Sequence, residues 1–221
     1  MTKATILYRS EQLIALDKPT GLLVHRGWAQ DEDTLLTQAR ELSGLFVYPL
    51  HRLDRGASGV VVFALSKQVA RELGHAFAEQ HVHKRYLALV RGVAPERAFI
   101  DHPVPRTEGG LRAAAQTEVR RLATHDYYSL VEARPLTGRL HQIRRHLKHL
   151  GHPLIGDVNY GNGEHNRKFR ALGIARLALH CFEIALPATE SVGAVTIRAP
   201  LPKELRDPLQ AFGFDLSALA I

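Results

Sequence analysis

The stretch AAAQTEVRRLATHDYYSLVEARPL, residues 113–136, decides the fold class. Its two halves are rich in strand-forming residues and flank a polar centre at Thr124–Asp126, a pattern that predicts a β-hairpin. Elsewhere strand-like runs often follow one another directly, which favours antiparallel pairing over a doubly wound parallel sheet. We therefore expect an α+β fold, with a mixed, mainly antiparallel sheet and flanking helices.

The other elements are expected on both sides of this hairpin. Strands are predicted at 13–18, 47–54, 59–65, 83–92, 176–187 and 194–200, and helices at 34–44, 67–80, 138–150 and 202–212. Asp31 or Asp33 is the expected N-cap of the first helix, Ser66 caps the second, and Gly44 and Gly151 are expected stops. The expected buried stripes are Leu35, Leu36, Ala39 and Leu42 in the first helix and Val69, Ala70, Leu73 and Phe77 in the second.

Length and charge narrow the class of protein. Strand and helix patterns interleave without a long linker, so we expect the 221 residues to form a single domain, 1–221. Lys and Arg outnumber Asp and Glu by 29 to 22, and phosphate backbones are the usual partners of a net charge of +7. The surplus is concentrated in 134–170, where Asp157 and Glu164 are the only acids. The alternative is a merely solubilising basic face.

The single cysteine and the N-terminal residues indicate the cellular compartment of the protein. Cys181 lies in an apolar run, so no disulfide framework or thiolate zinc site can form, and we expect it to be buried in a reducing compartment. The first twelve residues become polar too early for a signal peptide, and no apolar run approaches the roughly 20 residues of a membrane span. We expect a cytoplasmic protein that binds no membrane.

The stretch LHRLDRGASG, residues 50–59, contains the first candidate for chemistry. If 50–54 is a strand, Arg52 and Asp54 share one face, and Asp54 stands at the strand's tip. The small residues 56–59 that follow leave room for a ligand. Asp54 is then either a working carboxylate or an aspartate that satisfies the amides of a turn.

The helix expected at 138–150, opened by Thr137 or Gly138, contains a second candidate. At 100° per residue its apolar stripe consists of Leu140, Ile143, Leu147 and Leu150. His141, Arg145 and Lys148 gather on an adjacent, solvent-facing side, where a nucleic-acid backbone could reach them. Arg144 lies at the border of the stripe, and a half-buried guanidinium needs an anionic partner. Asp54 is one candidate for that partner, and a structural salt bridge with another acid is the alternative.

Other kinds of site have little support in the sequence. His146, His149 and His152 recur every three residues and His81 lies near His83, but no HExxH arrangement accompanies them, so we expect no metal. No glycine-rich phosphate loop is present, and we expect no nucleotide cofactor. Ser58 lacks the surroundings of a nucleophilic serine. Tyr86, in the short basic strand HKRYLALV, is either a core tyrosine or a platform for a base.

These stretches, in this order, resemble the RNA pseudouridine synthases, in the branch of that family with an HRLD motif. The resemblance runs from about residue 6 to 200, and it consists of LDKPTGLLVHRG, HRLDRGASGVVVFAL, KRYLALVRG, LTGRLHQIRRHLKHLGHPLIGDVNYG and RLALHCFEI. It implies the catalytic fold of that family, an isomerase that converts uridine in RNA to pseudouridine, and neither a metal nor a cofactor.

The resemblance also implies roles for particular residues. Asp54 corresponds to the catalytic nucleophile, Tyr86 to the tyrosine that packs on the target base, and Arg144 to the arginine paired with the nucleophile. Leu179 corresponds to a leucine that lines the pocket, and Arg52 to the arginine that fills the space left by the flipped uridine. His141, Arg145 and Lys148 are the expected contacts to the RNA backbone.

Within the family the best resemblance is to a tRNA-modifying member whose target is uridine 65 of the T stem, and it includes VHRGW and the HNR of GEHNRKF. We expect a monomer without an N-terminal S4-like domain. The alternatives are an rRNA enzyme, or an RNA-binding or RNA-folding protein without activity. Two departures are that Gly56 and Ala57 stand where the family usually has another loop sequence, and that the stretch before the HQIR helix is shorter.

Overall fold

The computed structural model describes residues 3–26, 33–107 and 109–217, and in it the chain forms two compact units. The first unit comprises Met1–Lys84 and Cys181–Pro200, and the second comprises Arg85–His180 and Leu201–Ile221. The chain passes from one unit to the other within strand β5 (His83–Arg91) and again within β11 (Leu179–Leu186). The single domain expected from the sequence stays a prediction.

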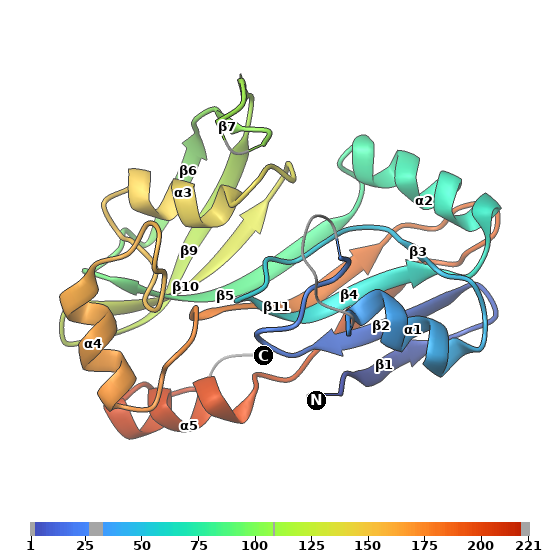
Figure 1. Cartoon of the computed structure of the whole chain (residues 1–221). Helices are drawn as coiled ribbons and strands as arrows, with labels where there is room; N and C mark the ends of the chain where they lie inside the picture. The colour runs from blue at the N-terminus through green and yellow to red at the C-terminus, as the bar shows by residue number, and fades with distance from the viewer. Residues whose placement is uncertain (1–2, 27–32, 108, 218–221) are drawn as a thin grey trace. The chain divides into compact units, whose positions relative to one another are not determined.

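In the described residues of the first unit, an antiparallel sheet is accompanied by two helices, which Figure 1 shows beside it. Strand β2 (Leu13–Lys18) pairs with β1 (Thr5–Arg9) on one side and with β4 (Ser58–Ala64) on the other. The two-residue β3 (Tyr48–Pro49) also pairs with β4, and β12 (Val195–Arg198) pairs with β11. Every residue of β4 is buried, because helix α2 (Lys67–Ala78) packs on this strand.

The two helices of this unit begin and end largely where the sequence predicts. Ser66 caps α2, and Gly44, with φ of 71°, ends α1 (Leu35–Ser43). The cap of α1 is Thr34 rather than Asp33, because the Thr34 hydroxyl accepts from the Thr37 amide and the Thr37 side chain bonds back to Thr34. Asp31, the other expected cap, lies outside the described residues. The buried stripe was wrong at Leu42, which is 39% exposed.

The second unit contains the predicted hairpin. Strands β9 (Gln116–His125) and β10 (Tyr128–Pro135) pair antiparallel, with β5 on the other side of β10 and β6 (Arg97–Asp101) on the other side of β9. A separate short hairpin is formed by β7 (Val104–Pro105) and β8 (Arg112–Ala113). These strand pairs and those of the first unit are antiparallel, which confirms the expected α+β fold with a mainly antiparallel sheet.

Among the residues that the structure describes, three helices belong to the second unit: α3 (Gln142–His149), α4 (Gly163–Ala171) and α5 (Lys203–Phe212). Helix α3 packs on β10, as Figure 1 shows. Tyr128, Phe169 and Phe212 bring β10, α4 and α5 together, with ring centroids 4.6 to 5.6 Å apart. Edge-to-face packing of this kind stabilises a core beyond the area that it buries.

Helix α3 begins later than the sequence predicts, at Gln142 instead of Thr137 or Gly138. His141 has φ of 53°, a left-handed conformation that a helix cannot include. The Gln142 side chain accepts from the Arg139 amide and from the Thr137 hydroxyl, which ties the preceding turn to the start of the helix. Ile143 and Leu147 are buried as expected, whereas Leu140 and Leu150 are half-buried.

Candidate active site

The segment Leu50–Asp54 is not a strand, so the alternation used to orient Asp54 was wrong. A backbone bond joins it to β4, from the Leu50 amide to the Val62 carbonyl (3.1 Å). The next bond goes to a side chain, because the Val62 amide donates to Nε2 of His51 (3.1 Å). The His51 ring also stacks on Phe77, with centroids 5.5 Å apart. The His51 side chain therefore replaces a backbone partner of β4 and fixes the segment that ends at Asp54.

His51 anchors this segment as a neutral ring. Burial, and next the positive charge of Lys84, lower the pKa of His51 from 6.5 to about 3. Because Nε2 accepts the Val62 amide, the ring proton is on Nδ1. Protonation would put a second donor against the Val62 amide and break this anchor.

We expect the anchor to make stability depend on pH. With a lowered pKa, the unfolded chain binds a proton at His51 that the folded chain does not, so stability is full above pH 6.5 and declines as the pH falls toward 3. His51→Gln keeps an acceptor for Val62 without the titration. Urea unfolding at pH 7 and at pH 4.5 should show a smaller loss for this variant than for the wild type. Equal losses would contradict the prediction.

The loop after Asp54 is held by the turn that follows β2. Lys18 is fully buried, and its Nζ donates to the carbonyls of Pro19 (2.9 Å), Leu22 (2.6 Å) and Arg55 (3.2 Å). The Thr20 hydroxyl donates to the Gly56 carbonyl (2.8 Å), and the Gly21 amide donates to the Arg55 carbonyl (2.8 Å). The departure at Gly56 and Ala57 therefore occurs in a loop that several bonds fix.

Gly59 follows this loop at the start of β4 and leaves no room for a side chain. Its φ is 112°, and a Cβ there would lie 2.1 Å from the carbonyl oxygen of Cys181. We expect Gly59→Ala to destabilise the fold by about 2–5 kcal/mol through strain and overpacking. Thermal unfolding tests this, with Gly74→Ala as the control.

Gly74 lies within α2, where a Cβ would meet no neighbouring atom of the described residues within 4 Å. The same substitution there should stabilise the helix by about 0.5–1 kcal/mol. If both variants melt at similar temperatures, the close approach of Gly59 to Cys181 does not limit stability.

In the second unit, Arg144 has the anionic partner that its burial demands. The partner is Asp157, which accepts from Nε at 2.7 Å and from Nη2 at 2.8 Å. Arg144 is 7% exposed and Asp157 is 1% exposed. The structural salt bridge considered as an alternative thus exists, while the pairing of Arg144 with Asp54 stays a prediction.

Asp157 is well prepared to remain ionised in this buried position. Burial alone raises the pKa of Asp157, but the hydrogen bonds and charge of Arg144, with the amides of Tyr160 and Asn159, outweigh it and lower the pKa below its usual value. The aspartate is held in turn by Asn166 of α4, whose amide donates to the Asp157 carbonyl (2.9 Å) while its oxygen accepts the Gly156 amide (2.8 Å). Helix α4 therefore positions Asp157, and through it Arg144.

Tyr86 and Leu179 are buried, at 7% and 4% exposure. Tyr86 lies opposite Ala133 on β10, on the other face of the strand from Arg85, which bonds Glu132 at 2.6 Å. Glu132 also accepts from Arg120 and Arg134. The roles of Tyr86 and Leu179 at the target base stay predictions, as does the role of Arg52, an exposed residue of the first unit.

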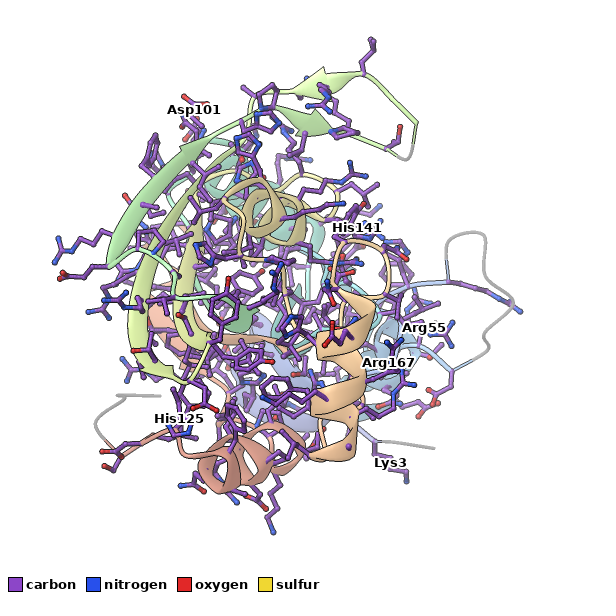
Figure 2. The ribbon with its side chains drawn as sticks, turned by 90° about the vertical axis from the view of Figure 1, so that its left-hand side faces the viewer. Lys3, Arg55, Asp101, His125, His141 and Arg167 are labelled. Carbon is purple, nitrogen blue, oxygen red and sulfur yellow. The ribbon has the colours of Figure 1, made fainter. Side chains whose placement is uncertain are left out.

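The three expected RNA contacts meet around a residue that the sequence did not single out, Tyr160. Nδ1 of His141 and the Tyr160 hydroxyl are 3.1 Å apart, and Arg145 and Lys148 lie 4.9 and 5.9 Å from the centre of the Tyr160 ring. The predicted solvent-facing arrangement holds only for Lys148, because His141 precedes the helix and Arg145 is half-buried. Figure 2 labels His141 among the side chains of this unit.

The histidines that suggested a metal site have other contacts. His146 is fully buried between the Thr117 hydroxyl (2.9 Å) and the His102 carbonyl (2.8 Å). Within the described part of the chain, no three His, Cys, Asp or Glu side chains come together as metal ligands would. Among the same residues, no helix has the length and apolarity to cross a membrane.

Comparison with known proteins identifies the family of this chain. Residues 12–149 match the family described as RNA pseudouridylate synthase. The chain is 38% identical to "tRNA pseudouridine synthase C" of Vibrio cholerae, over 97% of this chain and 98% of the relative, and 38% identical to the protein of the same name from Haemophilus ducreyi, over 95% and 96%.

Solved structures give the same result. Human RNA Pseudouridylate Synthase Domain Containing 1 superposes with a TM-score of 0.76 at 30% identity, covering 93% of this chain and 87% of that one. Human RNA Pseudouridylate Synthase Domain Containing 4 gives 0.77 at 27% identity, covering 94% and 92%. The α+β chain with the HRLD segment and the buried Arg144–Asp157 pair therefore belongs to the RNA pseudouridylate synthase family, and it is an RNA pseudouridine synthase.

Proposed function

We propose that this enzyme converts a uridine of tRNA to pseudouridine, and that the target is uridine 65 of the T stem. The observation that carries the choice of tRNA is the 38% identity, over nearly the full length of both chains, to relatives named tRNA pseudouridine synthase C. The net charge of +7 suits a polyanionic substrate. The position of the uridine rests on the resemblance of the motifs.

The reaction is an isomerisation with a simple balance. The bond from N1 of the base to C1′ of the ribose breaks, the base turns, and a bond from C5 to C1′ forms; C5 gives up its proton and N1 gains one. No water is consumed and no electron is transferred. A hydrolytic glycosidase uses a second carboxylate to handle water, whereas this isomerisation needs only one. We assign that carboxylate to Asp54, whether it attacks the ribose, attacks the base or assists a glycal intermediate.

The other residues would bind and orient the substrate. Arg144, held rigidly by Asp157, is suited to orient the Asp54 carboxylate, since a guanidinium presents its donors in a fixed plane. Tyr86 would pack on the target base and Leu179 would line its pocket. Arg52 would fill the space that the target uridine leaves in the RNA helix. Extruding the uridine costs a few kcal/mol, which contacts to the RNA phosphates would offset. His141, Arg145 and Lys148 would supply such contacts.

We expect the enzyme to work in the cytoplasm as a monomer, without a cofactor. The decisive experiment compares pseudouridine maps of tRNA and rRNA from cells with and without the protein. Loss of the signal at uridine 65 alone supports the proposal. A site lost in rRNA instead would identify an rRNA enzyme, and persistence of every site would contradict the assignment of an active synthase on these RNAs.

A further inference from the structure

A pocket of about 310 Å³ lies in the second unit, and Asp54, Tyr86 and Arg144 are not among its lining residues. Its walls come from the two residues before β7, from β7 and β8, from α3 and from Tyr160. The lining residues are His102, Pro103, Val104, Pro105, Arg112, Arg145, Lys148, His149 and Tyr160. This volume is at the lower end for a ligand site and is enough for a phosphate with the sugar attached to it.

The walls of this pocket are fixed by specific bonds. The buried His146 donates from Nε2 to the His102 carbonyl (2.8 Å), which ties the start of the hairpin to α3. The His102 ring stacks on His149, with centroids 3.9 Å apart and planes within 15°. Nη1 of Arg112 lies 3.2 Å from Nε2 of His102 and donates to the Pro103 carbonyl (3.3 Å). The cationic side chains are therefore held around an existing hollow.

The charges that line this pocket are positive. Arg112, Arg145 and Lys148 line it, and no Asp or Glu among the described residues does. Nε of Arg145 is buried, and no described residue accepts a hydrogen bond from it. Such a state is costly for a guanidinium donor. Asp101 precedes the pocket residue His102, but its carboxylate accepts from Gln116 (3.0 Å), and Figure 2 shows it at the edge of the sheet. An anionic ligand with several acceptor oxygens would match the positive charge of Arg112, Arg145 and Lys148.

We propose that this pocket binds a backbone phosphate of the RNA substrate, at a nucleotide other than the target uridine. The inference rests on the proposed function, which makes RNA the substrate. A phosphodiester offers planar pairs of oxygens to Arg112 and Arg145 and a point charge to Lys148. The stacked imidazoles and the Tyr160 ring beside these cations offer apolar surface to the attached ribose.

The test is a double substitution, Arg112→Gln with Lys148→Gln, at two exposed positions. Equilibrium binding of an unmodified tRNA transcript is measured over a range of salt concentrations. Each phosphate contact contributes about 0.9 to the slope of log K against log salt, so we expect the slope to fall by about 1 and the affinity by about tenfold. The matched control is Lys67→Gln with Arg71→Gln, which removes the same two charges from exposed positions of α2.

The control should keep the wild-type slope. If the pocket variant has the slope and affinity of the control, the pocket does not bind RNA phosphate and the inference is wrong. Titration with inorganic phosphate at constant ionic strength tests whether the pocket binds free phosphate instead of an RNA backbone phosphate. Saturable binding of free phosphate that the pocket variant loses, with unchanged tRNA binding, would also overturn the inference.

Failure of the proposed function has a different signature. In that case the wild-type protein yields no pseudouridine, whatever the salt slopes are. If the wild type forms pseudouridine and the pocket variant binds tRNA as the control does, only the phosphate site fails.

Discussion

Asp54→Asn is expected to abolish pseudouridine formation while the protein still binds tRNA. Loss of the only carboxylate assigned to the chemistry should reduce the single-turnover rate by about 10⁴-fold or more, which corresponds to roughly 5 kcal/mol of transition-state stabilisation. The affinity for tRNA should stay within about threefold of wild type, since phosphate contacts supply most of it. Because C5 loses its hydrogen in the reaction, release of tritium placed at C5 of uridine measures the rate.

Asp33→Asn is the matched control for this variant. Asp33 is a half-buried aspartate of the same unit whose carboxylate accepts from the Gln38 amide (3.0 Å). The asparagine keeps an acceptor at that site, so the rate should match that of the wild type. If Asp54→Asn reacts as fast as Asp33→Asn, Asp54 is not the nucleophile. A wild-type protein that binds tRNA and yields no product would instead favour a non-catalytic RNA-binding role.

The parts of the fold that the sequence predicted are those in which apolar residues recur with a clear period. Strand β4 and helix α2 have such patterns, and so does the β9–β10 hairpin. Helix α4 was not predicted, because Phe169 is its only buried residue and a polar helix leaves no stripe to detect. Strands β1 and β6 were missed for a similar reason, since most of their residues are half-buried or exposed.

For the candidate site, too, the sequence predicted only the features that depend on the periodicity of apolar residues. Helical periodicity predicted that Arg144 is partly buried and therefore needs an acidic partner. It could not predict which acid is the partner, because Asp157 lies in a turn outside the helix. A signal for Asp157 was present, since Asp157 and Glu164 are the only acids in 134–170. The orientation of Asp54 could not be derived, because the His51 side chain replaces the expected strand pairing.

Asp157→Asn is the second substitution with a large expected effect. It removes the countercharge that Asp157 gives to the buried guanidinium of Arg144, and breaking a buried ion pair in this way costs about 3–5 kcal/mol. The asparagine oxygen can still accept the amides of Asn159 and Tyr160, so the loss reflects the charge more than the turn. Urea unfolding should show it. Asp207→Asn, at the exposed pair with Arg206, should change stability by less than about 1 kcal/mol.

The pH dependence separates loss of charge from a distorted turn. Because the folded protein holds the pKa of Asp157 below its ordinary 3.8, the ionised pair stabilises the fold fully above that value and less as the pH falls below it. The gap between wild type and Asp157→Asn should therefore narrow in acid, and a constant gap would indicate a distorted turn instead. If Arg144 orients Asp54, the variant, while still folded and saturated with tRNA, should also react more slowly with little change in KM. An unchanged rate would leave the ion pair a structural role alone.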